Sequence, residues 1–230
     1  MSDRDVLTST QIFDAGLEDF RQLAGPIRAR YRTDGFAAGL AFVNCVGEVI
    51  AEAADGSNRS PDVSLSDSHV TITLSSHDVG GVTGRDVAVG RRISAVAAEM
   101  GLESDTASLM QVEYALDTDS GERVAGFYSA LLGAQTSDVH SGGGLVDPTG
   151  QVNALWWQVP REDSRFSLPQ FASQQRWQPD IWVSHDEVQA RIAAALAAGG
   201  RLVSDSAAPS YWVLEDPDGN RACICAAMID

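Results

Sequence analysis

The chain has 230 residues, 44% of them hydrophobic, and a formal net charge of -16 at pH 7. An acidic protein repels phosphate backbones and anionic lipid surfaces, so we expect no nucleic-acid partner and no membrane partner. All 16 basic residues are arginines, which excludes a Schiff-base lysine and a P-loop lysine and favours a bacterial source. The polar start, Met1 to Asp5, is unlike a signal peptide, and we therefore expect a cytoplasmic protein.

The first predicted elements are a helix and a strand hairpin. Helical periodicity runs from Asp34 to Ala54, and two short strands follow at Val63–Leu65 and Val70–Leu74. The second strand alternates apolar residues with threonines, and we expect it to leave an open sheet edge. The apolar face expected of the helix consists of Phe36, Leu40, Val43, Val46 and Ile50.

A loop and a second helix complete the first half. The loop spans Ser75 to Gly81, Thr83 is a candidate N-cap, and Gly101 suits the end of the helix. The polar stretch from Leu102 to Ser108 is predicted to be a linker. The apolar face expected of this helix consists of Val89, Ile93, Val96, Ala97 and Met100.

The second half contains an internal repeat. A strand at Leu109–Leu116 and a strand at Ile181–Val183 each precede an amphipathic helix. Each helix is followed by a hairpin with a similar turn, Asp147–Gly150 in the first copy and Asp216–Gly219 in the second. The order predicts two copies of strand-helix-strand-strand, whose sheets can curl around a shared cleft. The apolar helix positions are Val124, Phe127, Tyr128 and Leu131, then Val188, Ile192, Ala195 and Leu196.

The first half resembles the pterin-4a-carbinolamine dehydratases. The resemblance rests on Pro61-Asp62, the run from Val70 to Thr83, and Asp86, with matching spacing. It implies an α+β domain over residues 1–102, with an antiparallel sheet and helices on one face. It also implies a lyase that removes water from a 4a-hydroxytetrahydropterin such as 4a-hydroxytetrahydrobiopterin. That reaction needs an acid at the departing oxygen and a base at a ring nitrogen proton, and histidine suits both roles.

The same resemblance suggests the residues of a site. It implies a catalytic role for His77, Asp86 and Arg85. The family has two histidines before the proline, where this chain has Arg59 and Ser60. Arginine cannot act as a base at neutral pH, so any dehydratase activity is expected to be weak or degenerate. The residues expected around the substrate are Arg59, Ser60, Pro61, Ser76, Asp78 and Val79.

The second half resembles the glyoxalase/bleomycin-resistance, or vicinal oxygen chelate, superfamily. Phe127–Gly133 is similar to its helix-end motif, and Asp216–Asn220 is similar to its closing turn. The resemblance implies paired βαββ units over residues 109–230. No histidine falls at the positions that match the family's metal ligands, so we expect no metal and no cofactor. Those positions are Gln111 or Glu113, Gln158, Gln178 or Asp180, and Cys223.

Two alternatives to the dehydratase hypothesis stay open. The second half could be a metal-free cleft in a non-enzymatic protein that binds a pterin-like or aromatic small molecule. The first half could also serve only as an oligomerisation unit. In every case a homo-oligomer is expected, with a dimer favoured. The aromatic residues that could line a cleft, or equally fill a core, are Trp156, Trp157, Trp177, Trp182, Tyr211 and Trp212.

Overall fold

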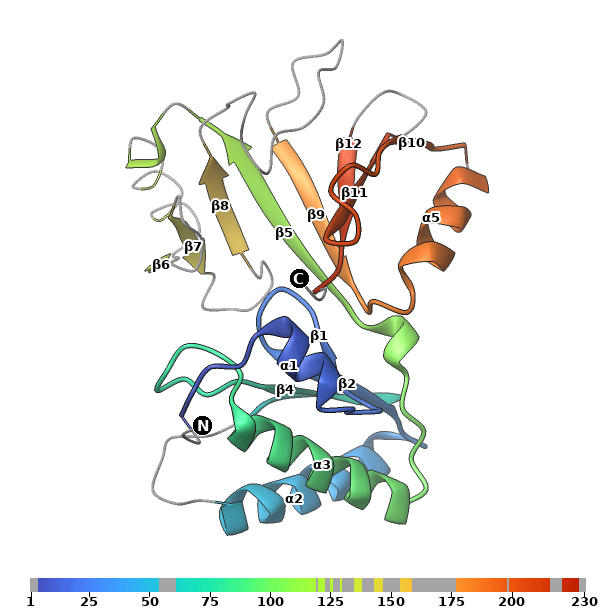
Figure 1. Cartoon of the computed structure of the whole chain (residues 1–230). Helices are drawn as coiled ribbons and strands as arrows, with labels where there is room; N and C mark the ends of the chain where they lie inside the picture. The colour runs from blue at the N-terminus through green and yellow to red at the C-terminus, as the bar shows by residue number, and fades with distance from the viewer. Residues whose placement is uncertain are drawn as a thin grey trace. The chain divides into compact units, whose positions relative to one another are not determined.

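The structure is a computed structural model in which two compact units can be described separately (Figure 1). Unit 1 is Met1–Leu109 with Ser184–Asp186 and Ala227–Asp230, and unit 2 is Met110–Val183 with Glu187–Ala226. Both units combine helices with a sheet, so the predicted α+β class is confirmed. The described residues are 4–53, 61–118, 120–122, 125, 129, 135–137, 143–146, 154–158, 177–197, 199–215 and 221–227.

Unit 1 contains a four-stranded antiparallel sheet in the order β1-β2-β4-β3. The predicted hairpin is confirmed as β3 and β4, but the expectation that the second of these strands leaves an open edge is wrong. It lies inside the sheet because β2, a strand that we did not predict, pairs with its other side. The strands are β1 (Arg21–Gln22), β2 (Ile27–Arg32), β3 (Asp62–Leu65) and β4 (His69–Leu74).

Helices α2 (Phe36–Ala53) and α3 (Gly84–Glu99) lie side by side against this sheet, and the short α1 (Ser9–Asp14) adds Ile12 to the core (Figure 1). Apolar residues on the helix side of β2 and β4 alternate with polar residues on the other side. The main members of this core are Ile27, Ala29, Tyr31, Phe42, Val46, Val70, Ile72, Leu74, Val89, Ile93 and Ala97.

The buried face of α2 differs from the predicted one. Phe36 and Leu40 are 53% and 45% exposed, whereas Phe42 and Val49 are buried. Gly39 explains the difference, because a Cβ atom at this position would lie 2.5 Å from the Cδ1 atom of Leu65. The helix therefore turns its glycine toward β3, and the residues in line with that glycine enter the core.

The length and composition of α2 alone would allow it to cross a membrane, with a mean hydropathy of 1.5 over 18 residues. The buried helix of a folded domain can have the same properties. Phe42, Val46 and Val49 belong to the core of unit 1, which accounts for the apolar character of one side of the helix.

The segment expected to be a linker is hydrogen-bonded to unit 1. The backbone N–H of Arg32 donates to the carbonyl of Glu103 over 2.9 Å, and that of Asp105 donates to the carbonyl of Arg30 over 2.7 Å. The buried Asp105 carboxylate also pairs with Arg30 Nε at 3.2 Å. Glu103 and Asp105 lie after residue 102, the predicted end of the first domain. Their bonds to β2 show that this segment stabilises the sheet and does more than join two domains.

Unit 2 contains an eight-stranded sheet in the order β10-β11-β12-β9-β5-β8-β7-β6. Antiparallel β5 and β9 lie at its centre, and each has a parallel neighbour, β8 and β12 respectively. Two further antiparallel strands complete each copy, β7 and β6 in the first and β11 and β10 in the second. The repeat is therefore confirmed, with four strands per copy where three were predicted. The strands are β5 (Met110–Asp117), β6 (Gln135–Ser137), β7 (Gly144–Val146), β8 (Ala154–Gln158), β9 (Trp177–Val183), β10 (Arg201–Ser204), β11 (Tyr211–Glu215) and β12 (Arg221–Cys225).

Helix α5 (Val188–Ala197) is the predicted helix of the second copy, and it buries Val188 and Ile192. The corresponding motif of the first copy, Phe127–Gly133, lies outside the described residues except for Ser129. The two predicted turns at 147–150 and 216–219 also lie outside them.

The domain limits of 1–102 and 109–230 stay a prediction that truncation can test. We expect a fragment of residues 1–102 to fold alone, because about 100 residues suffice for a domain with its own core. A fragment of residues 1–109 should melt at a higher temperature, since it keeps the bonds of Glu103 and Asp105 to β2. Circular dichroism and amide NMR dispersion provide the measurement, and a 1–109 fragment without a cooperative transition would contradict the prediction.

Candidate functional site

The first candidate site lies at the end of the β3–β4 hairpin. Immediately after β4, the carbonyl of Ser76 accepts hydrogen bonds from the backbone N–H groups of Val79 (3.2 Å) and Gly80 (3.0 Å), and the N–H of Ser76 donates to the carbonyl of Gly81 (2.9 Å). Gly80 has a φ of 68°, a conformation that glycine adopts without strain. A tight turn therefore presents His77 and Asp78 between β4 and α3.

Asp86 is the centre of a buried hydrogen-bond network behind this turn. Its Oδ2 atom accepts bonds from Ser76 Oγ (2.7 Å), Thr83 N (2.7 Å) and Thr83 Oγ1 (3.0 Å). Thr83 is the N-cap of α3, and Asp86 completes a capping box three residues later. The carboxylate that the resemblance implicates in catalysis thus holds the start of α3 against the turn.

Arg85 and Asp78 form an ion pair beside that network. The buried Arg85 Nη2 atom lies 2.8 Å from Asp78 Oδ1 and 3.1 Å from Asp78 Oδ2. The hydrogen bond from the Arg85 guanidinium, reinforced by its charge, holds the pKa of Asp78 below its usual value. The pair joins the first turn of α3 to the loop that carries His77.

His77 is exposed, like the adjacent Asp78, whereas Ser76 is buried. Pro61 directly precedes β3, and the register pairs Asp62 with Thr73 near the end of β4. Pro61 and His77 therefore belong to the same end of the hairpin. Arg59 and Ser60 lie outside the described residues.

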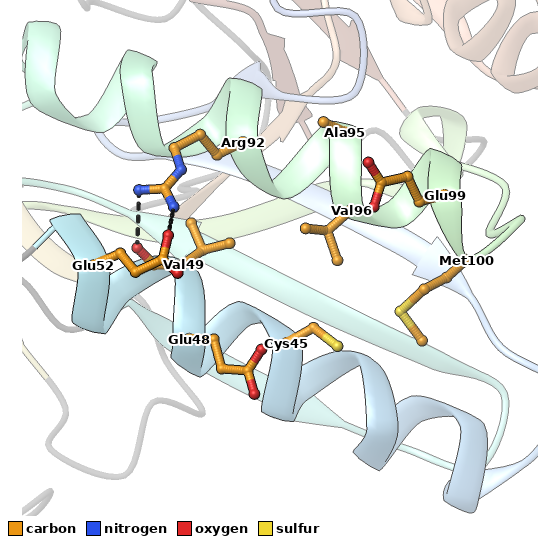
Figure 2. Close-up of a pocket in the computed structure, with 9 residues that line it drawn as sticks. All are labelled: Cys45, Glu48, Val49, Glu52, Arg92, Ala95, Val96, Glu99 and Met100. Atoms are coloured by element: carbon orange, nitrogen blue, oxygen red, sulfur yellow. Dashed lines mark hydrogen bonds and ion pairs between the residues drawn. The ribbon is translucent and has the colours of Figure 1, made fainter.

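A separate groove of 420 Å³ runs between α2 and α3 (Figure 2). Arg92 reaches across it to Glu52, and its Nη1 atom also donates to the carbonyl of Val49. None of the residues implicated by the resemblance lines this groove. The lining residues are Cys45, Glu48, Val49, Glu52, Arg92, Ala95, Val96, Glu99 and Met100.

A second candidate site lies at the centre of the unit 2 sheet. Glu113 on β5 is directly opposite Asp180 on β9, and the two side chains are only 3% and 7% exposed. Gln111 Nε2 donates to Glu113 Oε1 over 2.8 Å, and Gln178 Nε2 donates to Asp180 Oδ1 over 2.8 Å. The two halves of the repeat therefore contribute the same Gln-x-acid pair to one face of the sheet.

The third strand of this site, β12, contributes a cysteine. Cys223 is paired in register with Asp180, and its Sγ atom lies 3.3 Å from Gln178 Nε2. Burial, followed by the charge of Asp180, raises the pKa of the Cys223 thiol, and burial similarly raises that of Cys225. Both cysteines are free and buried, so they are protonated thiols at neutral pH.

The residues present do not fit a catalytic metal. Within the described ranges, no three His, Cys, Asp or Glu side chains form a group that could hold a metal ion. The amide nitrogens of Gln111 and Gln178 already point at the carboxylates, and a protonated thiol is a poor ligand. The expected absence of a metal stays a prediction, and this donor set supports it.

The predicted aromatic residues do not form one cluster. Trp157 packs with Leu145 and Leu155, which places it in the core of the first copy of the repeat in unit 2. Trp156 is its neighbour in β8 and so points to the opposite face of the sheet. Trp182 pairs in register with Gln111 and shares the face of the Gln-x-acid pairs. At least part of the aromatic content is therefore structural.

The two units define a two-module α+β protein with a dehydratase-like hairpin and a paired βαββ sheet. A family model for pterin 4 alpha carbinolamine dehydratase matches residues 8–96, and one for a glyoxalase-like domain matches residues 113–225. The chain belongs to the pterin-4-alpha-carbinolamine dehydratase family through its first half and carries a glyoxalase-like domain in its second.

Several bacterial relatives named for pterin-4-alpha-carbinolamine dehydratase are similar to the first half. One from Nocardia farcinica is 34% identical over 97 residues, which are 42% of this chain and 94% of the relative. One from Mycobacterium tuberculosis is 35% identical over 94 residues, which are 40% and 95% of the two chains. A crystal structure titled transcriptional coactivator/pterin dehydratase from Brucella melitensis is 21% identical, with a TM-score of 0.37, covering 40% of this chain and 99% of that chain.

Two features of the sites were not recognised from sequence. Thr83-Gly84-Arg85-Asp86 has the spacing of a capping box, a local signal for the structural role of Asp86. The family resemblance grouped Gln111 or Glu113 with Gln178 or Asp180 as matching ligand positions, but the direct pairing of Glu113 with Asp180 was not predicted. It depends on the register between strands that are far apart in the chain, and the predicted second strand began only at Ile181, after Asp180.

The network around Asp86 predicts a stability effect. Asp86→Ala removes three hydrogen bonds and leaves buried donors unsatisfied, so it should lower the free energy of unfolding by about 2 kcal/mol. Urea denaturation provides the measurement, with Asp67→Ala in the exposed turn before β4 as the matched control. Equal stability of the two variants would show that the network does not stabilise α3.

The ion pair predicts a pH effect. The pKa of Asp78 is lower in the folded state than in the unfolded state, where it is about 3.9. The ion pair therefore stabilises the folded protein fully above this unfolded-state pKa, and the stabilisation is lost as the pH falls through the folded-state pKa. The melting temperature should therefore fall between about pH 5 and pH 3, and Asp78→Asn should reduce that slope. Calorimetry across this range checks the prediction, with Asp67→Asn as the control, and an unchanged slope in Asp78→Asn would contradict it.

Proposed function

We propose that the first half is a dehydratase-like module that removes water from a 4a-hydroxytetrahydropterin with low efficiency. The observation that carries this proposal is the exposed His77 on a turn fixed by Ser76, Thr83 and Asp86. Family membership and relatives named for this activity support it.

His77 is the group best suited to move a proton in this site. Its imidazole could protonate the hydroxyl that leaves C4a, since histidine exchanges protons near neutral pH. Asp86 already accepts three hydrogen bonds, and Arg85 already pairs with Asp78. We therefore assign Asp86 and Arg85 to positioning, with Pro61, Ser76, Asp78 and Val79 as the frame of the turn.

The low efficiency follows from the residues before Pro61. The family pattern has two further histidines there, and this chain has Arg59 and Ser60. One general acid or base typically contributes about 10²–10⁴-fold to a rate, so the loss of two such groups should cost orders of magnitude. We further propose that the protein acts in the cytoplasm as a homo-oligomer, with a dimer favoured.

A second candidate function is the binding of a small molecule by unit 2. The observation that favours it is the set of buried polar side chains at the centre of the sheet, where an apolar core would otherwise be expected. This function needs neither a metal nor His77.

Activity should depend on His77. His77→Ala is expected to lower the rate of 4a-hydroxytetrahydropterin dehydration at least tenfold, and Arg59→His/Ser60→His should raise it, because histidines would then stand at all three family positions. The assay follows the absorbance of the hydroxypterin against its spontaneous breakdown. His69→Ala, in the same strand hairpin, is the matched control.

Two results would contradict this proposal. The first is a wild-type rate no higher than spontaneous breakdown, together with no activity in Arg59→His/Ser60→His. The second is a catalysed rate that His77→Ala and His69→Ala leave equally unchanged.

A further inference from the structure

The segment of residues 4–7, which precedes α1, lies along the end of the turn between β4 and α3. The backbone N–H of Leu7 donates to the carbonyl of Val82 over 2.8 Å, and Val6 forms an antiparallel bridge with Thr83. Thr83 is the residue that caps α3. The 4–7 segment is therefore paired, like a short strand, with the chain at the point where the turn ends and the helix begins.

Val6 packs on the base of the same turn at Gly81. A Cβ atom at position 81 would lie 2.6 Å from Val6 Cγ1 and 3.3 Å from Val6 Cγ2, but 3.6 Å from Val6 Cβ. The first distance is far shorter than the roughly 3.5–4.0 Å at which two carbon atoms pack, and the last falls within that range. Since Gly81 does not have a positive φ, the Val6 side chain and not the backbone conformation is what leaves room only for glycine. The N–H of Ser76 donates to the carbonyl of Gly81 over 2.9 Å, so this contact bears on the residue directly before His77.

Arg4, at the other end of the segment, reaches the tip of the turn. Its Nε atom lies 3.9 Å from Asp78 Oδ2, and Asp78 directly follows His77. The hydrogen bond from Arg85 is the main cause of the lowered pKa of Asp78, and the charge of Arg4 lowers that pKa further. An ion pair with a side chain as exposed as that of Arg4, at 67%, contributes little to stability. Asp78 is nevertheless held by positive charges from two elements, α3 and the 4–7 segment.

Helix α1 fixes the point from which the segment extends. Thr8 Oγ1 accepts a hydrogen bond from the N–H of Gln11 over 3.2 Å, and Gln11 Oε1 accepts one from the N–H of Thr8 over 2.9 Å. This capping box defines the direction in which the chain enters the helix. Ile12 of the same helix belongs to the core of unit 1. The segment is therefore attached to the core at one end and to the turn along its length.

We propose that residues 4–7 are a positioning segment of the dehydratase-like site, in which Val6 sets the base of the turn and Arg4 holds its tip. His77 lies in the chain between Ser76 and Asp78, the two residues on which these contacts act. The segment acts through the position of His77 and not on the substrate. This inference rests on the proposed function of the first half, and it extends the site to residues that precede the region of the family match, 8–96.

The contact of Val6 with Gly81 provides the main test, in the full chain. Gly81→Ala should lower kcat for the dehydration of a 4a-hydroxytetrahydropterin at least about tenfold, because an error of about 1 Å in the position of a catalytic group can cost about 100-fold in rate. Val6→Ala/Gly81→Ala should recover most of the lost rate, because the two Cβ atoms then lie 3.6 Å apart. Gly47→Ala on α2, where a Cβ atom would meet no described atom within 4 Å, is the matched control.

Amide hydrogen exchange tests the same contact without a substrate. The N–H groups of Val79 and Gly80 donate to the carbonyl of Ser76 over 3.2 and 3.0 Å, so their exchange rates report on the turn. Gly81→Ala should speed their exchange, Val6→Ala/Gly81→Ala should slow it again, and Gly47→Ala should leave it unchanged. If Gly81→Ala does not fold, recovery of the fold in the double variant supports the contact.

Arg4→Gln tests the other end of the segment. It should lower kcat by a smaller factor than Gly81→Ala, and the difference from the wild type should disappear at about 1 M salt, where the Debye length is about 3 Å. Arg201→Gln is the matched control, because the Arg201 side chain is 63% exposed and is also paired with a carboxylate, that of Glu215. Equal effects of the two substitutions would show that Arg4 has no special part in the site.

Three results would overturn the inference. Gly81→Ala could match Gly47→Ala in both measurements, or the double variant could be no better than Gly81→Ala in either. Gly81→Ala could also speed the exchange and leave a catalysed rate unchanged, which would mean that the segment holds the turn without positioning His77. A wild type without a catalysed rate would contradict the proposed function, and the exchange rates would then decide alone whether the segment fixes the turn.

Discussion

The carboxylate of Asp86 is the constraint on which the arrangement of unit 1 depends. One of its oxygens joins the N-cap of α3 to the turn that follows β4. Together with the Arg85–Asp78 ion pair, this connection fixes the start of α3 relative to the end of the hairpin and to the turn that carries His77. The same hydrogen bonds occupy the Asp86 carboxylate, which supports our proposal that Asp86 positions the turn while the exposed His77 moves the proton.

Unit 2 shows a comparable constraint in the register of its central strands. The pairing of β5 with β9 sets Glu113 against Asp180, and the repeat then places a glutamine next to each acid. Two acidic side chains directly opposite each other in a strand pair are destabilising when both are charged. Among the described residues of this face there is no histidine, which distinguishes it from the metal centres of the superfamily that the second half resembles. The protonated thiol of Cys223 agrees with this difference.

Local patterns in the sequence predicted the hairpin of unit 1, the N-cap at Thr83 and the repeat of unit 2, because each depends on residues close together in the chain. Features that depend on long-range packing were missed. The buried face of α2, for example, is set by the close approach of Gly39 to Leu65. Strand β2 was also missed, although Ile27, Ala29 and Tyr31 alternate with arginines in a local pattern typical of a half-buried strand. The structural role of Asp86 could have been found from its spacing to Thr83. The family resemblance grouped Glu113 and Asp180 at one site, but it did not give the strand register that sets them opposite each other.

The central claim is that His77 supplies the remaining acid–base group of a weakened dehydratase site. The most direct measurement is the pH dependence of kcat/KM for the dehydration of a 4a-hydroxytetrahydropterin by the full chain, compared between the wild type and His77→Ala. We expect an ionisation in the wild-type profile that is absent from the profile of the variant, whose residual rate follows only spontaneous breakdown. Superimposable profiles with equal rates would contradict the claim.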